Sequence, residues 1–408
     1  MRIIFFSDYF IPEIGAPAAH VYDRCRIWVE QGHEVTVITN TPNYPNGKPY
    51  NGYKNKFRYW EDIDGIKVLR VMTYMAENKG TIKRTLDYFS YFISSFLNSF
   101  FLKKPDVVLS TSPHIFTPLG AILFSFLRRV PHVVEIRDLW PESIAATTGI
   151  KKTSLIYKAF ELIEFFIYRN SKNIILFTKA FKTSLQEKGI NPDKMHVVIN
   201  GANLKLFSEQ KYDQSLARSL GLINKFIISY FGTHGLAHNL LNAINAAKLV
   251  QDDDIHLLFI GDGAEKQKMI KAVKEDNISN VHFIDKKPRD ELSKYWSISN
   301  AGLVHLKKDP AFKKVIPSKI FETMAIGIPI VYAGPKSEGS EIIKQTNSGL
   351  VSEANSPHDL AKNFKILKEN TSLYREFKTN SKNSSKNFSR ESQAAGTMNV
   401  LEKSLKSK

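Results

Sequence analysis

Two charged residues, Lys319 and Glu322, stand three positions apart directly after Pro317 and Ser318, where the sequence predicts the start of a helix. Side chains three residues apart on an α-helix lie on the same face. The free backbone N–H groups at a helix N-terminus favour phosphate. A lysine there can add positive charge at a diphosphate, while the glutamate accepts hydrogen bonds from sugar hydroxyls. The pair predicts a nucleotide-sugar site, although an amphipathic helix with a surface ion pair has the same spacing.

Three blocks of sequence, far apart in the chain, resemble the retaining family 4 glycosyltransferases. The run Pro-Ser-Lys-x-x-Glu-x-x-x-x-Gly-x-Pro-Ile-Val at 317–331 is similar to the donor-site signature of that family. Arg-Asp-Leu-Trp-Pro-Glu-Ser at 137–143 and Pro-Glu-Ile-Gly-Ala-Pro-Ala-Ala at 12–19 resemble one branch of it, the N-acetyl-L-fucosamine transferase-like proteins of bacterial capsule and O-antigen synthesis. The resemblance spans nearly the whole chain. It implies a GT-B fold, an α/β architecture with two Rossmann-like domains facing a central cleft.

The same resemblance implies catalytic roles for three charged residues at the end of a predicted strand. Arg137 would bind the donor diphosphate or an acceptor phosphate, and Asp138 would orient or deprotonate the acceptor hydroxyl. Glu142 is a weaker candidate for the same task as Asp138. The alternative is a structural Arg–Asp pair with Trp140 as a packed anchor.

Glycine turns after predicted strands are the next candidates for phosphate contact. Gly15 precedes a predicted helix over 18–31, and a glycine there lets backbone approach a phosphate closely. Gly232 begins the turn Gly-Thr-His-Gly at 232–235, where the family places its diphosphate loop. The resemblance makes Thr233 and His234 secondary donor contacts.

Two further donor-side positions follow from the resemblance. Lys287 lies where relatives use backbone groups to hold the nucleotide base, and Glu338 follows the strand after the donor-site signature. For Glu338 the alternative is a solvated loop carboxylate. For both residues the resemblance predicts a position near the donor more than a role for the side chain.

The chain also departs from the family pattern. Many relatives carry a glutamate eight positions before the one at 322, but this chain has Lys314 there. An arginine and a lysine often follow the glycine turn, where this chain has His238 and Asn239. Contacts with the sugar and the diphosphate must therefore differ, and Lys319, Arg137 and helix dipoles would carry the phosphate charge.

Short apolar runs alternate with helical patterns along the chain, which predicts parallel sheets covered by helices on both faces. Two such sets predict two Rossmann-like domains. We expect an acceptor-binding, membrane-associated domain over 1–200, a donor-binding domain over 201–385, and a last helix over 386–408 that returns to the first domain. The predicted strands cover residues 2–7, 34–39, 67–71, 106–111, 132–137, 173–178, 196–200, 226–232, 256–261, 281–285, 302–306, 329–333 and 349–351.

The formal net charge of +17 and the pI near 9.5 favour an anionic partner. No nucleic-acid motif is visible, and the basic residues form no single long tract. The single Cys25 excludes an internal disulfide and a thiol-rich metal site. The apolar N-terminal run is too short for a signal peptide and predicts a first buried strand. These features fit a cytoplasmic protein.

The segment 81–104, TIKRTLDYFSYFISSFLNSFFLKK, is rich in aromatic residues and has basic residues at both ends. Its aspartate, asparagine and serines make it a poor membrane-spanning helix. An interfacial helix with basic flanks fits better and predicts peripheral association with the inner face of the cell membrane. The alternative is a core helix packed on a sheet.

Together these features predict a retaining transferase. It would move a sugar from a UDP-sugar, an N-acetylhexosamine such as N-acetyl-L-fucosamine, to an undecaprenyl diphosphate-linked saccharide in capsule or O-antigen synthesis. No Asp-x-Asp motif is evident near the expected cleft, so we expect neither a metal nor another cofactor besides the donor. The alternatives are a UDP-sugar 2-epimerase and a non-catalytic, membrane-associated protein that binds nucleotide-sugars.

Overall fold

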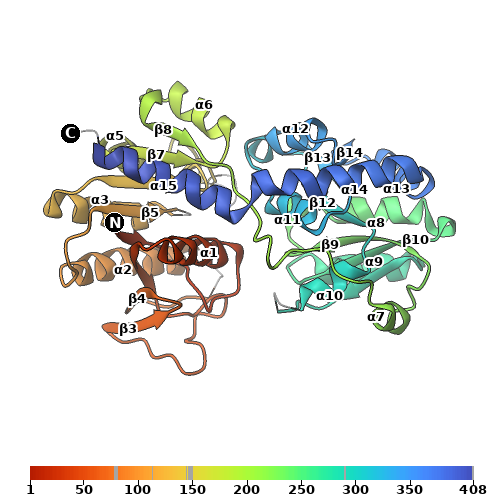
Figure 1. Ribbon diagram of the computed structural model, residues 1–408, viewed down its shortest axis with the longest axis horizontal. Coiled ribbons are helices and arrows are strands. Elements are labelled where there is room, and N and C mark those ends of the chain that lie inside the picture. Colours follow the sequence, from red (N-terminus) through yellow and green to blue (C-terminus); the bar gives the residue numbers. More distant parts are fainter. Residues whose placement is uncertain (78–80, 113, 144, 146–149, 289–290, 407–408) are drawn as a thin grey trace. The chain divides into compact units, whose positions relative to one another are not determined.

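The computed structural model describes the chain except residues 78–80, 113, 144, 146–149, 289–290 and 407–408 (Figure 1). The described residues form two compact units. Unit 1 comprises Met1–Ile199 and Gln393–Lys408, and unit 2 comprises Asn200–Ser392. The C-terminal segment that belongs to unit 1 therefore starts at Gln393, whereas the expected last domain segment started at residue 386.

Unit 1 is built on an eight-stranded sheet with the order β3-β4-β2-β1-β5-β6-β7-β8. Neighbouring strands are parallel except β3 and β4, which form an antiparallel hairpin. Asp64 and Gly65 close this hairpin with φ of 52° and 79°, the left-handed conformation that such tight turns require. The strands are β1 (Arg2–Phe6), β2 (Glu34–Asn40), β3 (Arg58–Ile63), β4 (Ile66–Val71), β5 (Val107–Thr111), β6 (His132–Ile136), β7 (Asn173–Leu176) and β8 (Met195–Val197).

Helices cover both faces of this sheet, because successive side chains of a strand point to opposite faces. Ile3 and Phe5 belong to a core shared with α1 and α15, whereas Ile4 and Phe6 belong to a core shared with α2 and α3. The described helices are α1 (Ala16–Glu30), α2 (Thr81–Ser99), α3 (Phe116–Arg128), α5 (Leu155–Asn170), α6 (Lys179–Glu187) and α15 (Arg390–Lys406).

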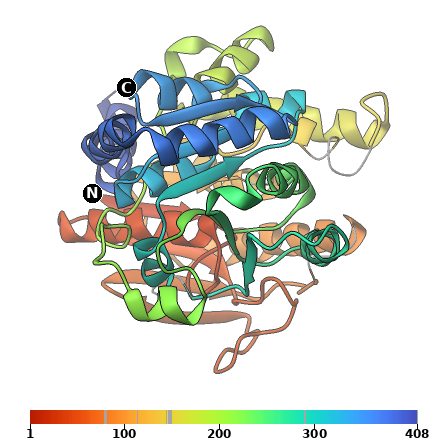
Figure 2. The same ribbon diagram turned by 90° about the vertical axis from the view of Figure 1, so that its right-hand side faces the viewer.

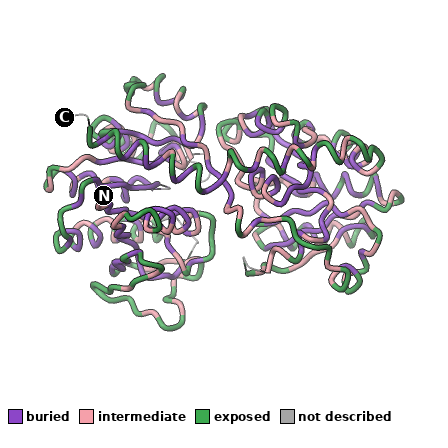
Figure 3. The backbone as a smooth tube through the Cα atoms, viewed as in Figure 1, coloured by how far each residue is buried: buried purple, intermediate pink, exposed green. Residues whose placement is uncertain are grey.

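Unit 2 contains a six-stranded sheet with the order β11-β10-β9-β12-β13-β14, and all of its strand pairs are parallel. Helices lie on both faces of the sheet (Figure 2), and the buried strands run inside the unit (Figure 3). Its strands are β9 (Phe226–Phe231), β10 (Ile255–Ile260), β11 (Val281–Ile284), β12 (Ala301–His305), β13 (Ile330–Gly334) and β14 (Gly349–Glu353). Its helices are α7 (Gln214–Ser219), α8 (Leu241–Lys248), α9 (Lys266–Glu275), α10 (Leu292–Ser297), α11 (Ser318–Ile326), α12 (Glu338–Gln345), α13 (Pro357–Glu369) and α14 (Thr371–Ser385).

The predicted α/β class with two parallel-sheet, Rossmann-like units is confirmed. Every predicted strand overlaps an observed one, and the strand that the sequence analysis missed is β3. Its residues are mostly exposed, so they lack the apolar run by which the other strands were recognised.

A buried ion pair and its hydrogen bonds join four elements of unit 1, namely α1, β5, β6 and α15. Arg24 of α1 and Glu135 of β6 are both fully buried, and Arg24 Nη2 donates to Glu135 Oε1 over 3.0 Å. The Thr111 hydroxyl donates to the same oxygen at 2.8 Å, and Arg24 Nη1 lies 3.4 Å from Thr397 Oγ1 of α15. Burial alone would raise the pKa of Glu135, but Arg24 holds that pKa below its usual value. The pair therefore ties α1 and α15 to the end of β6.

Replacing Arg24 alone should destabilise the protein strongly. Arg24→Met leaves the Glu135 carboxylate buried without its partner, which costs roughly 3–5 kcal/mol in comparable cases. We expect urea unfolding followed by tryptophan fluorescence to show a clearly lower midpoint. The double variant Arg24→Met/Glu135→Leu removes both charges and should recover most of the loss. Equal losses in the single and double variants would show that charge pairing is not the cause.

Candidate functional site

The predicted pair lies near the start of α11, with Lys319 in its first turn and Glu322 in the next. The structure brings Lys319 against the glycine turn that follows β9. A side chain at Gly232 would lie 3.0 Å from both Cε and Nζ of Lys319, and Gly232 has a φ of +128°. The positive φ favours glycine at this position, and the short distance shows that the end of the Lys319 side chain packs against the turn. Lys319 Nζ also lies 5.1 Å from the centre of the Tyr230 ring.

The electrostatics around Lys319 concentrate positive charge on one side chain. Burial lowers the pKa of Lys319, while Glu322 opposes that shift. His238 lies nearby and donates from Nδ1 to the His305 carbonyl over 3.2 Å if that nitrogen carries the proton. Burial and, to a smaller extent, the charge of Lys319 lower the pKa of His238 to about 4. At neutral pH His238 is therefore uncharged. We call Tyr230, Gly232, His238, Lys319 and Glu322 the Lys319 cluster.

The two residues expected to contact the donor after Gly232, Thr233 and His234, differ in burial. Thr233 is exposed, and its carbonyl accepts a hydrogen bond from the Tyr230 hydroxyl at 2.9 Å. His234 is fully buried, and its backbone N–H already donates to the carbonyl of Asp262 at 2.9 Å. Both ring nitrogens of His234 are buried and have no hydrogen-bond partner among the described residues. Its contact with the donor stays a prediction.

Glu338 lies near the Lys319 cluster, whereas Lys287 follows the edge strand of the sheet. Glu338 is the first residue of α12, which begins beside α11. A side chain at the next residue, Gly339, would lie 3.0 Å from Cδ1 of Ile320 and 3.4 Å from Cδ of Pro317. Lys287 follows the edge strand β11, which β10 separates from β9. Glu338 is thus near the start of α11, whereas Lys287 belongs to the edge of the sheet.

In unit 1, Arg137 and Asp138 extend directly from the end of β6. Arg137 Nη2 lies 2.8 Å from His20 Nδ1, and its backbone N–H donates to the Ser112 hydroxyl at 2.8 Å. Nη1 of Arg137 is buried and has no hydrogen-bond partner among the described residues. Burial raises the pKa of Asp138, and Arg137 opposes this shift. Arg137 therefore offers a hydrogen-bond donor to an anion. Asp138 offers a carboxyl group that keeps its proton to a higher pH than usual.

Glu142 is engaged elsewhere. One of its oxygens lies 2.6 Å from Nζ of Lys188, the residue after α6, and the same Nζ lies 3.1 Å from Glu164 of α5. An ion-pair network accounts for the charge of Glu142 without a ligand. The other carboxylate oxygen, Oε2, is buried and has no hydrogen-bond partner among the described residues. A role for Glu142 beside Asp138 stays a prediction.

Gly15 is the residue that precedes α1. Its φ of −178° is extended backbone that any residue adopts, and a side chain there would meet only Cδ of Pro17 at 3.7 Å. Neither the backbone conformation nor packing demands glycine at this position. The open space above the first turn of α1 is compatible with a ligand but does not identify one.

Sequence analysis missed a cluster of polar residues in unit 1. Asp8, Asn40 and His114 all lie at or just after the carboxyl ends of β1, β2 and β5, and all three are buried. His114 Nε2 lies 3.2 Å from Asp8 Oδ2, and Asn40 Nδ2 donates to Asp8 Oδ1 over 3.0 Å. The signal that selected Arg137, a polar residue directly after a predicted strand, would also have selected these residues.

Glu13 lies beside this cluster and is almost fully buried. Burial raises its pKa to about 7, although the backbone N–H groups of Asn43 and Tyr44 oppose the shift. The folded protein therefore binds a proton here that the unfolded chain has released between about pH 4.5 and 7. By linkage, this residue lowers the stability of the fold progressively as pH rises through that interval.

Glu13→Gln should therefore make the protein more stable at alkaline pH. Glutamine keeps the oxygen that accepts from Asn43 and Tyr44 but carries no charge. We expect the variant to gain stability relative to wild type between pH 5 and pH 8, by at most about 3 kcal/mol, as measured by urea unfolding at both pH values. Glu187→Gln at the exposed end of α6 is the matched control. A pH-independent difference for Glu13→Gln would show that the carboxylate carries no desolvation cost.

Comparison with known proteins agrees with this architecture. Residues 15–201 match the glycosyl transferase 4-like domain, and residues 213–384 match the glycosyl transferases of group 1. The first match lies almost entirely in unit 1 and the second lies in unit 2. The chain is therefore a glycosyltransferase. It belongs to the group 1 glycosyl transferases, and its fold is GT-B.

Relatives with low sequence identity extend over most of the chain. A protein of Escherichia coli K12, named as the colanic acid biosynthesis glycosyl transferase WcaI, is 25% identical over 80% of this chain and 82% of its own length. Glycosyltransferase WbjE of Pseudomonas aeruginosa is 25% identical over 64% of this chain and 65% of its own. The crystal structure of Anabaena HepE with UDP and glucose superposes with a TM-score of 0.72 at 15% identity, covering 98% of this chain and 99% of HepE.

Within the part of the chain that the structure describes, no group of three or more His, Cys, Asp or Glu side chains is arranged to hold a metal ion. No helix among the described residues combines the length and apolar character needed to cross a membrane.

Proposed function

We propose that this glycosyltransferase moves an N-acetylhexosamine, such as N-acetyl-L-fucosamine, from its UDP-linked form to a lipid-linked saccharide in bacterial capsule or O-antigen synthesis. The donor assignment rests on the contact between Lys319, at the start of α11, and the turn at Gly232 after β9. The HepE complex with UDP and the naming of WcaI for colanic acid biosynthesis support the choice of UDP and of polysaccharide synthesis. An undecaprenyl diphosphate carrier is the proposed lipid.

The Lys319 cluster suits the charge that develops during transfer. As the bond between sugar and diphosphate breaks, negative charge grows on the leaving diphosphate, and preorganised donors lower the barrier most. Lys319 and the free N–H groups of the first turn of α11 would supply those donors. Because His238 is uncharged at neutral pH, the diphosphate depends on Lys319 more than it would with an added arginine.

The remaining roles in the proposed transfer follow from residue chemistry. Glu322 would accept hydrogen bonds from sugar hydroxyls, and the Ser318 hydroxyl already donates to it at 3.3 Å. Asp138 would orient the acceptor hydroxyl, and Arg137 offers its unpartnered Nη1 to an acceptor phosphate. Family membership implies retention of the anomeric configuration, with the leaving phosphate accepting the acceptor's proton.

Substitutions in α11 should separate contacts to the diphosphate from contacts to the sugar. Lys319→Met should weaken binding of UDP about ten- to a hundredfold, because a hydrogen bond to a charged group contributes roughly 1.5–3 kcal/mol. Glu322→Gln should weaken binding of the UDP-sugar more than binding of UDP. Isothermal titration calorimetry measures both affinities, and Lys344→Met at the exposed end of α12 is the matched control. Wild-type affinity for UDP in Lys319→Met would refute this placement of the donor.

Product analysis separates the proposed transferase from the alternatives. Wild-type protein incubated with UDP-N-acetylglucosamine and no acceptor should leave the configuration of the sugar at C2 unchanged. Formation of the 2-epimer would instead identify an epimerase. Binding of UDP-sugars without turnover across lipid-linked acceptors would favour a non-catalytic binding protein.

The membrane assignment is supported by the unusual surface of α2. One side of this helix is exposed and apolar, and its members are Ile82, Leu86, Phe89, Ile93 and Leu97, with Phe100 and Phe101 directly after the helix. The opposite side packs inward, but it contains Ser95 and Asn98 next to Tyr91. The helix therefore both packs on the sheet and exposes an apolar stripe, so the two alternatives from the sequence are not exclusive.

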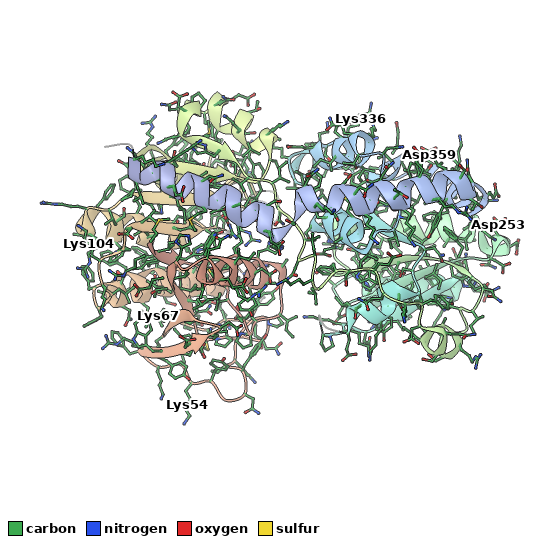
Figure 4. All side chains as sticks on the ribbon, in the orientation of Figure 1. Lys54, Lys67, Lys104, Asp253, Lys336 and Asp359 are labelled. Carbon is green, nitrogen blue, oxygen red and sulfur yellow. The ribbon has the colours of Figure 1, made fainter. Side chains whose placement is uncertain are left out.

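The stripe continues over two neighbouring helices. Phe89 of α2 contacts Phe116 of α3 with ring centres 5.8 Å apart, and Phe126 of α3 contacts Phe166 of α5 at 6.2 Å. Further exposed apolar side chains on α3 and α5 are Leu127, Leu155, Ile156 and Leu162. Lys104 points outward from unit 1 beyond the end of α2 (Figure 4). An apolar surface with basic residues at its margin fits an anionic membrane interface.

Polar substitutions in the stripe should release the protein from membranes. Each lost apolar side chain removes about 1–2 kcal/mol of transfer free energy, so Phe89→Ser/Ile93→Ser/Leu97→Ser should lower partitioning roughly a hundredfold or more. Co-sedimentation with phosphatidylethanolamine–phosphatidylglycerol vesicles measures this. Leu236→Ser/Leu249→Ser, which changes exposed leucines of unit 2, should have no effect. Unchanged partitioning of the triple variant would exclude this surface as the membrane contact.

A further inference from the structure

Unit 1 contains a small acidic cavity that the donor assignment does not use. It has a volume of about 20 Å³, enough for one water-sized group. It opens at the carboxyl ends of β1 and β2, the edge of a parallel sheet where ligands bind in doubly wound folds. Its lining residues are Asp8, Tyr9, Glu13, Asn40, Asn43, Tyr44, Ala76, Arg84, Asp87 and Tyr88.

Three acceptor atoms of the lining have no hydrogen-bond partner among the described residues. They are Oε2 of Glu13, Oδ1 of Asn40 and Oδ1 of Asp87, and all are buried. The Glu13 and Asn40 side chains are each only 4% exposed. Leaving a buried acceptor unsatisfied costs about 1–3 kcal/mol. Unpaired acceptors that line one cavity therefore indicate a guest that donates hydrogen bonds.

The charge of the cavity restricts that guest further. Three carboxyl groups, those of Asp8, Glu13 and Asp87, line it, while the basic residue of the lining is Arg84. Burial raises the pKa of Glu13 and of Asp87, so negative charge is already unfavourable here. An added carboxylate or phosphate would increase that penalty, whereas a neutral hydroxyl would relieve it.

A wider groove adjoins the cavity. Its volume is about 620 Å³, and it is lined by Pro12, Asn46, Lys48, Pro49, Tyr50, Asn51 and Tyr53. Pro12 precedes Glu13 in the chain, and the Tyr50 hydroxyl donates to the Tyr44 carbonyl at 2.7 Å, so the groove and the cavity share a wall. Half-buried tyrosines with amide side chains between them offer apolar faces and hydrogen-bonding groups to sugar rings.

We propose that the groove holds the terminal sugar of the acceptor, that the acidic cavity receives one of its hydroxyl groups, and that the site therefore selects a neutral acceptor sugar over a hexuronic acid. Glu13 accepts the hydrogen bond from that hydroxyl through Oε2, while its other oxygen remains held by the N–H groups of Asn43 and Tyr44. The acceptor role rests on the proposed transferase function, whereas the preference for neutral sugars rests on the cavity itself.

Saturation-transfer NMR on the full chain tests the preference. The probes are methyl glycosides of neutral hexoses, namely glucose, galactose and mannose, and of the matching hexuronic acids. We expect transfer to at least one neutral glycoside and about tenfold weaker binding of its uronic acid counterpart. Absence of binding by every neutral glycoside, or equal binding of the two members of each pair, would overturn the inference.

The variant Glu13→Gln/Asp87→Asn removes two ionisable carboxyl groups while keeping the side-chain shapes. It should reduce the difference between neutral and anionic glycosides to about twofold or less, and the control Glu187→Gln/Asp193→Asn should leave that difference unchanged. A difference that persists in the cavity variant would overturn the role of these carboxyl groups.

Binding of UDP, measured by calorimetry on the same samples, reports on unit 2 separately. Urea unfolding followed by tryptophan fluorescence shows that unit 1 of the variant is folded, because Trp28, Trp60 and Trp140 lie in unit 1. UDP binding without glycoside binding would overturn the cavity inference and leave the proposed transferase function intact. Selective glycoside binding without UDP binding would overturn the proposed transferase function and leave the cavity inference intact.

Discussion

The buried pair of Arg24 and Glu135 is the constraint on which the rest of unit 1 depends. Two charges without solvent are tolerable only because they neutralise each other and because Thr111 and Thr397 supply further hydrogen bonds. The pair fixes the end of β6, and Arg137 leaves the sheet two residues later. The same interaction thus holds α1 and α15 together and sets where a proposed acceptor contact begins.

In unit 2, close packing of two backbone turns fixes the position of Lys319. A side chain at Gly261 would lie 1.9 Å from the carbonyl oxygen of Gly232, and one at Gly263 would lie 2.5 Å from the carbonyl oxygen of His234. The turns after β9 and β10 therefore lie directly against each other, with Lys319 on the Gly232 turn. Rigid turns of this kind hold a lysine in place before any ligand arrives, which suits electrostatic stabilisation of a leaving group.

Most of the fold could be predicted from the sequence, and so could the position of Lys319 and Glu322 near the start of a helix. Apolar strands such as β9 can be recognised in the sequence because they are buried on both faces. Lys319 and Glu322 lie on one helix in the structure, as their spacing predicted. Strand β3 was missed because it is exposed, although Asp64-Gly65 is a hairpin signal. The acidic cavity was missed because Glu13 and Asp87 are distant in sequence and meet only in the folded chain. The burial of His234 likewise depends on tertiary packing that residue order does not reveal.

The placement of α15 also determines the order in which the protein can be completed during synthesis. The Trp28 indole donates to the carbonyl of Ala394 at 3.1 Å, and Arg24 reaches Thr397. The part of the first sheet's face that α15 covers beside α1 therefore stays exposed until α15 has left the ribosome. Unit 2, in contrast, is continuous in sequence from Asn200 to Ser392. The half of the chain that is made second can finish folding first, and the N-terminal half must wait with apolar surface exposed, a state that chaperones recognise.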